Sequence, residues 1–279
     1  MKFTFYTNFA EMIKEKGIEA AASYAEKMGF DSVEILEIDK PTLFASLDEA
    51  KKAREVLAAH GLTMACYSVG TTLYNSPEME EALMRHAEFA AVLGSPFLHH
   101  TLILSLVMKE GMPSFEEGIA YVTDAAERVA NYAKTLGITC IYEDQGMYAN
   151  GIEGFGAFFS ELKRRCDNVG VCGDVGNSYF VDVESDAFFE AFAEDIVHVH
   201  IKDYIRKSCD TAPGSDWYRT RGGNWLRDTT VGSGCVNFPA IMTTLKRVGY
   251  TGPLALELCH PEPFDYGVKQ AMDYLSRLA

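Results

Sequence analysis

The feature that most constrains this chain is an alternation of strand-like and helix-like segments that recurs eight times along 279 residues. Each short apolar run is followed by a longer segment whose apolar residues have helical spacing. The expected strands are 3–6, 32–36, 62–68, 97–102, 139–142, 169–172, 196–201 and 254–258. The expected helices are 11–28, 46–60, 77–93, 114–136, 155–166, 187–193, 239–248 and 267–278. Eight such repeats predict a closed parallel (β/α)8 barrel with the helices outside it.

Glycines mark the ends of many of the expected helices. They lie where left-handed C-terminal caps are expected, a few residues before the next strand: Gly29, Gly61, Gly94, Gly137 and Gly249. An open doubly wound sheet is the alternative, but the sequence has no Gly-x-Gly-x-x-Gly motif after the first strand, which weakens a dinucleotide-binding fold. No linker rich in Ser, Gly or Pro divides the chain. We therefore predict a single (β/α)8 TIM barrel domain over residues 1–279.

Composition limits the classes of partner. Acidic residues number 40 against 25 basic residues, which gives a formal net charge of −15. This balance argues against a nucleic-acid partner, because the phosphate backbone binds basic faces. No apolar stretch approaches membrane-spanning length, and the first residues have the pattern of a strand rather than of a signal peptide. Seven scattered cysteines without a Cys-x-x-Cys motif suit a reducing compartment, so we expect a cytoplasmic protein without a membrane or nucleic-acid partner.

Four side chains of metal-ligand type lie at or near the ends of the last four expected strands: Glu143, Asp174, His200 and Glu257. In a barrel the carboxyl ends of the strands meet at one mouth, so these side chains are expected to converge. Each one alone fits a structural salt bridge, but a carboxylate among buried apolar residues is costly unless it is paired or bound to a metal. Three carboxylates and one imidazole suit a divalent cation. We predict a site for one such ion, with Mn²⁺ as the expected metal and Mg²⁺, Co²⁺ or Zn²⁺ as alternatives.

Other histidines lie close to this predicted site. Alternate side chains of a barrel strand face the interior, so His198 shares a face with His200 but lies one layer deeper. We expect His198 to be a hydrogen-bonded core residue rather than a ligand. Of His99 and His100, one faces inward by parity, and either a substrate hydrogen bond or a core role fits it. The remaining histidines are expected on the surface or in loops: His60, His86 and His260.

Three further side chains are candidates for the pocket. Glu34 on the second strand and Cys66 on the third are expected to line its floor or wall. Lys202 follows His200 by two residues and shares its face if the strand extends that far. Two roles fit Lys202: it polarises a substrate oxygen, or it pairs with Asp203, and the pairing is the simpler expectation.

The longest segment without a helix or strand pattern is 204–235. It carries several cations and aromatic residues: Arg206, Lys207, Arg219, Arg221, Arg227, Trp217, Tyr218 and Trp225. A loop of this length in a compact domain usually has a function, and in a barrel it would cover the C-terminal face. Clustered cations on an acidic protein favour a lid over an anionic or polyol substrate. A contact between copies in a homo-oligomer is an equally good interpretation.

Several motifs resemble those of the xylose-isomerase-like barrel superfamily of sugar phosphate isomerases and epimerases, which includes ketose 3-epimerases and inosose dehydratases. The motifs are His-Val-His-Ile-Lys-Asp at 198–203, Gly-Ser-Gly at 232–234 followed by Asn-Phe at 237–238, and the segment 249–257. The resemblance covers essentially the whole chain. It implies a TIM barrel with a divalent metal held by the four residues at the ends of the last four strands.

The same resemblance implies substrate contacts. In ketose 3-epimerases an arginine six residues beyond the metal histidine contacts the substrate, and Arg206 has that place. A histidine three residues after the metal aspartate does likewise, and here that position is Asn177. Those enzymes also have a second glutamate six residues past the ligand of strand five, where this chain has Ala149. These departures argue against a specific assignment as ketose 3-epimerase. The expected substrate-binding set is Arg206, Asn177, His99, Lys202 and Cys66.

The resemblance implies a sugar or sugar phosphate isomerase or epimerase. The metal is expected to chelate adjacent oxygens of a hydroxy-ketone and to act as a Lewis acid on the carbonyl, which acidifies the neighbouring C–H. Glu143 and Glu257 would flank the reacting carbon: one removes the proton to give an enediolate, and the other returns it. Return to the same carbon gives epimerisation, and return to the neighbouring carbon gives isomerisation.

Three alternatives remain open from the sequence. A metal-dependent dehydratase of a polyol or keto-inositol would use the same ligands. A zinc-dependent apurinic endonuclease shares the fold, but it needs additional histidine ligands and a basic DNA face, which seven histidines and a charge of −15 disfavour. A non-catalytic barrel that binds a sugar would also keep these residues.

Overall fold

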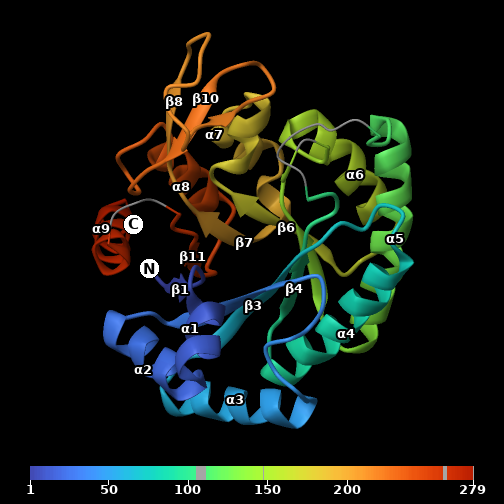
Figure 1. The fold of residues 1–279 in the computed structure, drawn as a ribbon, viewed down its shortest axis with the longest axis vertical. Helices are drawn as coiled ribbons and strands as arrows, with labels where there is room; N and C mark the ends of the chain where they lie inside the picture. The colour runs from blue at the N-terminus through green and yellow to red at the C-terminus, as the bar shows by residue number, and fades with distance from the viewer. Residues whose placement is uncertain (105–110, 147, 260–262, 279) are drawn as a thin grey trace.

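Eight parallel strands close into a barrel in the computed structural model, which describes residues 1–104, 111–146, 148–259 and 263–278 (Figure 1). The strands are β1 (Phe3–Phe5), β2 (Ser32–Ile38), β3 (Thr63–Gly70), β4 (Phe97–His100), β5 (Thr139–Tyr142), β6 (Val169–Asp174), β7 (Ile196–Ile201) and β11 (Leu254–Leu256). Their order around the barrel is β1-β11-β7-β6-β5-β4-β3-β2, and β2 pairs with β1 to close it. The predicted (β/α)8 barrel is therefore confirmed.

The helices lie outside the barrel and alternate with its strands (Figure 1). They are α1 (Phe9–Lys16), α2 (Ile18–Met28), α3 (Leu47–Ala59), α4 (Pro77–Leu93), α5 (Phe115–Thr135), α6 (Gly151–Arg165), α7 (Ser185–Ala191), α8 (Phe238–Arg247) and α9 (Phe264–Ser276). The sequence predicts one helix over 11–28, but the structure has two. Gly17 ends α1 with a positive φ of 82°, which glycine adopts readily, and α2 begins at the next residue.

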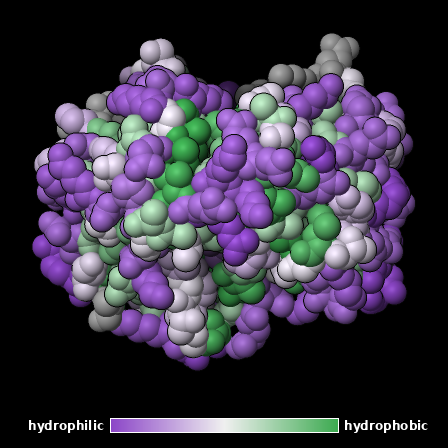
Figure 2. All heavy atoms as spheres, turned by 90° about the horizontal axis from the view of Figure 1, so that it is seen from below, coloured by the Kyte–Doolittle hydropathy of each residue, from purple (hydrophilic) through white to green (hydrophobic). Residues whose placement is uncertain are grey.

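Inward-facing and outward-facing residues of the barrel differ in chemistry. Outward residues pack on the helices: the Tyr142 ring, for example, meets the Phe158 ring of α6 at 5.1 Å. Inward residues include small and polar side chains, such as Thr4 and Ser32, whose hydroxyls lie 2.6 Å apart. The outer surface on the α2–α3 side is mostly hydrophilic, with smaller hydrophobic areas between the charged side chains (Figure 2). Among the described helices, none is long and apolar enough to cross a membrane.

The placement of His86 differs from the sequence prediction. His86 was expected near the surface but is fully buried on α4. Its Nδ1 lies 3.3 Å from the Tyr67 hydroxyl and its Nε2 3.3 Å from the Asp39 carbonyl, so the imidazole joins α4 to strand β3 and the end of β2. A helical residue that faces the sheet is buried whatever its polarity, provided that its nitrogens find partners. His260 lies outside the described residues.

His100 allows a prediction about acid stability. Its imidazole is fully buried against the Tyr142 ring, and burial lowers its pKa to about 3. In the unfolded chain this histidine has an ordinary pKa near 6.5, so as the pH drops the unfolded chain takes up a proton that the folded chain does not bind. The free energy of unfolding therefore falls as the pH drops below about 6.5. Between pH 7 and pH 5, wild type should lose about 2 kcal/mol more stability than the variant His100→Gln. Urea unfolding of both proteins at the two pH values measures this difference, and equal losses would contradict it.

The segment 204–235, predicted to be irregular, contains a three-stranded antiparallel sheet. Its strands are β8 (Tyr204–Lys207), β9 (Tyr218–Arg219) and β10 (Trp225–Asp228), in the order β8-β10-β9. Figure 1 shows β8 and β10 extending outward beside α7 and α8. The clustered cations stack on aromatic rings: Lys207 and Arg227 lie 5.0 and 5.1 Å from the Trp217 ring centre. Pairing of the short strands and these cation–π contacts order the segment.

Asp203 holds the base of this segment. The carboxylate is 1% exposed and accepts four backbone hydrogen bonds of 2.8 to 3.2 Å. The donors are the N–H groups of Tyr204, Gly232, Gly234 and Val236. A Cβ on Gly234 would lie 2.2 Å from Asp203 Oδ1, so only glycine allows this approach. The Gly-Ser-Gly motif at 232–234 is therefore explained by the carboxylate that it encloses.

Replacement of Asp203 by alanine should lower the free energy of unfolding by about 3 to 5 kcal/mol, because buried N–H donors lose an ionised acceptor. Asp203→Asn keeps one oxygen acceptor, so its loss should be smaller. Chemical denaturation of the three proteins gives the order. Equal stability of wild type and Asp203→Ala would show that the segment 232–236 is held by other contacts.

Candidate metal and active site

Two shifts in strand pairing set which residues meet inside the barrel. The β2–β3 register shifts just before Glu34, which then pairs with Cys66. The β6–β7 register shifts just before Cys172, so that Asp174 pairs with His200. An extra residue at a bulge re-aims the side chains that follow it. These shifts bring ligand-type residues from neighbouring strands to the same level of the barrel.

The four predicted ligands converge at the carboxyl ends of the strands. Each of Glu143, Asp174, His200 and Glu257 offers one ligand atom, and these atoms all lie within 4.8 Å of one another. His200 Nδ1 lies 3.2 Å from Glu143 Oε2, 3.5 Å from Glu257 Oε2 and 4.0 Å from Asp174 Oδ2. The side chain of Glu257 is 22% exposed, whereas the other three are buried. The cluster is thus open to solvent on the side of Glu257.

The chemistry of this cluster fits a divalent cation. Asp174 Oδ1 accepts the N–H groups of Gly176 and Asn177, both at 2.8 Å, which turns Oδ2 toward the cluster. The buried Asp174 Oδ2 lies 3.0 Å from the Lys202 ammonium but makes no aligned hydrogen bond within the described residues. Carboxylate oxygens and imidazole nitrogens are common ligands of Mn²⁺, Co²⁺ and Zn²⁺, and carboxylate oxygens are also ligands of Mg²⁺. A cation would therefore coordinate an oxygen that has an ion pair with Lys202 but no aligned hydrogen bond within the described residues.

Lys202 lies beside the cluster and does not pair with Asp203. Its ammonium is 3.0 Å from Asp174 Oδ2 and 2.9 Å from Glu257 Oε1. The simpler sequence expectation was wrong because neighbours on a strand point to opposite sides: Lys202 faces the barrel mouth, and Asp203 faces the segment 232–236. Burial lowers the pKa of Lys202, but the negative charges of Asp174 and Glu257 raise it by more. The pKa is therefore well above its usual range, and the ammonium stays charged. Three carboxylates, this ammonium and a divalent ion would together carry no net charge.

The two glutamates differ in their electrostatic surroundings. Burial raises the pKa of Glu143, but the neighbouring His99, His200 and Lys202 outweigh it and lower that pKa to about 2. Burial raises the pKa of Glu257 to about 7, with Asp174 adding to the effect and Lys202 opposing it. A bound cation would favour the ionised form of both carboxylates.

A buried network supports the cluster from below. Glu34 is fully buried and lies 3.0 Å from His200 Nε2 and 2.7 Å from His198 Nε2, and it also accepts the Ser68 hydroxyl. Burial raises the pKa of Glu34, but His200 and His198 lower it well below its usual range. His99 faces inward, with Nδ1 3.1 Å from Ser68 Oγ and Nε2 3.6 Å from a Glu143 oxygen. Burial lowers the pKa of His99 and favours the neutral imidazole.

A family model described as xylose isomerase-like TIM barrel matches residues 22–278. The chain belongs to this family. The ketose 3-epimerase of Arthrobacter globiformis is 28% identical over 258 residues, which cover 87% of this chain and 78% of the relative. The structure of an L-ribulose 3-epimerase matches with a TM-score of 0.76 at 16% identity, over 100% of this chain and 94% of the other. A structure of the IOLI protein with a zinc atom has a TM-score of 0.73 at 16% identity, over 100% and 99% of the chains.

On this xylose isomerase-like barrel, Asn177 lies next to Lys202, another residue of the predicted substrate-binding set. Its Oδ1 is 3.2 Å from the Lys202 ammonium. The Asn177 side-chain amide nitrogen is buried and makes no hydrogen bond to the described part of the chain. An unpaired buried N–H group beside an open cluster is suited to a ligand oxygen.

Two other predicted substrate residues have different surroundings. Arg206, on β8, pairs with Glu184 at 2.7 Å and lies 5.1 Å from the Tyr179 ring centre. These contacts hold its guanidinium on the β8 side of the protein rather than against the four-residue cluster. Cys66 is fully buried, with its thiol 3.7 Å from the Ser68 hydroxyl. It belongs to the layer of Glu34, below the cluster.

The sequence reasoning missed two side chains beside the cluster. The Tyr6 ring stacks on the His200 imidazole, with ring centres 4.7 Å apart and planes at 27°. Asp144 is fully buried with both oxygens unpaired among the described residues; burial raises the pKa of its carboxyl, and Asp174 and Glu143 add to this. Tyr6 is the last residue of one predicted strand and Asp144 is the second residue after another. This position at the carboxyl end of a barrel strand is the signal that would have identified them.

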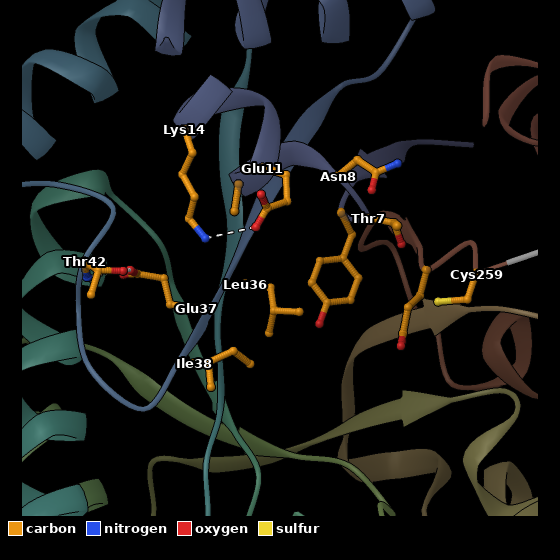
Figure 3. Close-up of a pocket in the computed structure, with 12 residues that line it drawn as sticks. Thr7, Asn8, Glu11, Lys14, Leu36, Glu37, Ile38, Thr42 and Cys259 are labelled. Atoms are coloured by element: carbon orange, nitrogen blue, oxygen red, sulfur yellow. Dashed lines mark hydrogen bonds and ion pairs between the residues drawn. The ribbon is translucent and has the colours of Figure 1, made fainter. Parts of the chain in front are cut away.

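A cleft of about 340 Å³ (Figure 3) lies next to Glu257, the one member of the cluster that lines it. Tyr6 and Glu257 line it together with Leu36 and Ile38 at the end of β2. Figure 3 also shows the ion pair of Lys14 and Glu11 at its edge, where the two atoms are 3.0 Å apart. Binding sites for small molecules have volumes of this order and combine apolar walls with a few polar groups.

Proposed function

We propose that this protein is a divalent-metal-dependent isomerase or epimerase of a small sugar or sugar phosphate. The observation that carries the proposal is the convergence of one histidine and three carboxylates within 4.8 Å at the mouth of a xylose isomerase-like barrel. The 28% identity to a protein named ketose 3-epimerase supports the reaction class. The solved structure of a similar barrel with a zinc atom supports metal binding at this fold.

The proposed metal ligands are Glu143, Asp174, His200 and Glu257, with Mn²⁺ as the expected ion. When bound, such an ion supplies Lewis acidity, which acidifies a C–H next to a coordinated carbonyl. Lys202 contributes a fixed positive charge beside Asp174 and Glu257, and the Asn177 amide offers an unpaired donor. These two groups are proposed to bind and orient substrate oxygens.

The proton is proposed to move between the substrate and two carboxylates. Glu143 and Glu257 approach the same His200 nitrogen from different strands, with oxygens 3.2 and 3.5 Å from it. A substrate carbon held beside the ion would therefore lie between two carboxylates. One takes the proton and the other returns it, which is general base and general acid catalysis. The Tyr6 ring stacks on His200 and lines the cleft beside Glu257, so it is proposed to form one wall of the substrate site.

Hydrogen exchange with solvent tests this proposal. Ketoses, sugar phosphates and inososes are incubated with the protein and Mn²⁺ in D₂O and followed by proton NMR. We expect loss of one carbon-bound proton signal and growth of an epimer or isomer from at least one sugar, only with metal present. Loss of water from the substrate would instead indicate a dehydratase. Exchange that persists without metal, or a wild-type protein that binds no divalent ion, would overturn the proposal.

A further inference from the structure

Glu34 lies at the centre of the buried network below the cluster, although nothing in the proposed reaction uses it. It stands on β2, which is separated from the strands of the metal-ligand candidates by β1 on one side and by β3 and β4 on the other. Oε1 lies 3.0 Å from His200 Nε2 and accepts the Ser68 hydroxyl, while Oε2 lies 2.7 Å from His198 Nε2. One fully buried carboxylate therefore contacts three polar side chains of two other strands.

These contacts determine the direction of the hydrogen bond to His200. An ionised carboxylate only accepts, so the proton of this bond is on His200 Nε2. His200 Nδ1 faces Glu143, Glu257 and Asp174, and it lies within hydrogen-bond distance of Glu143 Oε2, at 3.2 Å. When an ion takes the place of a proton at Nδ1, the neutral imidazole has its lone pair on Nδ1 and keeps its proton on Nε2, against Glu34. Contact with Glu34 thus selects the one tautomer in which the imidazole can act as a ligand at the cluster.

The same carboxylate sets the tautomer of a second imidazole. Ser68 gives its only hydroxyl proton to Glu34, so its oxygen must accept from His99 Nδ1 at 3.1 Å. A neutral His99 therefore has its lone pair on Nε2. This nitrogen is buried, makes no hydrogen bond within the described residues, and lies 3.6 Å from a Glu143 oxygen. His99 Nε2 is therefore a hydrogen-bond acceptor without a donor at the edge of the cluster. A substrate hydroxyl or a bound water could donate to it.

We propose that Glu34 is a positioning residue that holds His200 and His99 in the tautomers whose lone pairs face the cluster. His200 thereby presents a metal ligand, and His99 presents an acceptor for a hydroxyl O–H of the substrate. This inference rests on the proposed function, because it assumes an ion at the cluster. It adds that a hydroxyl group, rather than a carbonyl or phosphate oxygen, is the substrate group at His99.

The first test needs no mutation. Long-range ¹H–¹⁵N correlation spectra of the protein labelled at histidine and loaded with diamagnetic Zn²⁺ report which ring nitrogen carries the proton. We expect a proton on Nε2 of His200 and on Nδ1 of His99, with assignments from single His→Gln variants. The opposite tautomer at either residue would overturn the proposal for that residue.

The second test compares two glutamates on the same strand. Glu34→Gln should weaken Mn²⁺ binding by about 10- to 100-fold in calorimetric titration, because the amide can donate to His200 Nε2 and allows the other tautomer. Glu37→Gln is the matched control. Glu37 is 3% exposed and accepts hydrogen bonds from Thr42, Leu43 and Tyr67, but it makes no contact with the cluster among the described residues. The Glu37→Gln variant should be less stable than wild type, but its Mn²⁺ affinity should stay within about twofold of wild type.

The outcomes separate the two proposals. If wild type binds no Mn²⁺, the proposed function fails. If wild type binds Mn²⁺ and Glu34→Gln binds it equally well with unchanged His200 and His99 spectra, the positioning role fails alone. Equal weakening in Glu34→Gln and Glu37→Gln would also overturn it, since a general loss of packing would then explain both. If Glu34→Gln does not fold, the tautomers of His200 and His99 in the wild-type protein still test the positioning role.

Discussion

Replacing Glu143 or Glu257 by glutamine is expected to lower turnover of the responsive sugar by about 10²- to 10⁴-fold. Glutamine keeps the size of the side chain and one oxygen, but it cannot accept a proton from carbon. The two carboxylates approach His200 Nδ1 to 3.2 and 3.5 Å, so each is placed to reach the same bound molecule. Loss of either should therefore stop the proton from being taken or from being returned.

Because both residues are also proposed ligands, the assay must separate catalysis from metal loss. Rates are measured over a range of Mn²⁺ concentrations up to saturation, with occupancy checked by electron paramagnetic resonance of free Mn²⁺. Glu190→Gln, an exposed substitution whose carboxylate pairs with Arg247, is the control and should keep wild-type turnover. A Glu143 or Glu257 variant that turns over within about tenfold of wild type at full occupancy would remove that residue from the proton-transfer step.

The two variants can also be told apart by partial reactions. If one glutamate removes the proton and the other returns it, the variant lacking the second residue should still exchange a substrate proton with D₂O while making little product. The variant lacking the first should do neither. Identical loss of exchange and of product in both variants would indicate that the two carboxylates act on the substrate as one unit.

The barrel and the four-residue cluster could be predicted because both follow from local patterns combined with one topological rule. A strand–helix repeat fixes a parallel barrel, and a parallel barrel brings the carboxyl ends of all strands to one mouth. Glu143, Asp174, His200 and Glu257 each end or follow an apolar run, so their convergence needed no knowledge of contacts between distant residues.

What could not be predicted depends on contacts between strands far apart in the sequence. Glu34 meets His198 and His200 at separations of 164 and 166 residues, and the shift of register just before Glu34 is invisible in the sequence. The sheet in 204–235 was missed because its strands are short and pair through non-local hydrogen bonds rather than through a repeated apolar pattern. The placement of Lys202 failed for a simpler reason: sequence neighbours on a strand point to opposite sides, and this parity rule also applies to Asp203.

Removal of divalent metal should abolish turnover completely and lower thermal stability, and both losses should be reversed by adding Mn²⁺. Without a cation, Glu143, Asp174 and Glu257 crowd around His200 within 4.8 Å, with only the Lys202 ammonium and the imidazole to offset three negative charges. Binding to the folded state alone stabilises it by about 2.7 kcal/mol when free metal is 100 times its dissociation constant. Differential scanning calorimetry after dialysis against chelator, with and without added Mn²⁺, measures this gain.

The stabilisation by Mn²⁺ should depend on pH, and the pKa of Glu257 determines the direction of this dependence. The Glu257 pKa is raised to about 7, above its unfolded value near 4.5, so the folded chain binds this proton more tightly than the unfolded chain does. Stability of the metal-free protein therefore includes a contribution from Glu257 that is present below about pH 4.5 and lost as pH rises through 7. Mn²⁺ must displace the same proton, so it should bind more tightly, and stabilise more, at pH 8 than at pH 6.

His200→Gln is the variant that connects these effects to the cluster. It removes the nitrogen that all three carboxylates approach, so both the stabilisation by Mn²⁺ and its rise with pH should disappear. Reversible activity loss in wild type together with an unchanged Mn²⁺ response in His200→Gln would place the essential ion elsewhere on the protein. Full turnover of wild type in excess chelator would contradict a metal-dependent reaction altogether, because no other group of the cluster supplies the Lewis acidity that acidifies the C–H bond.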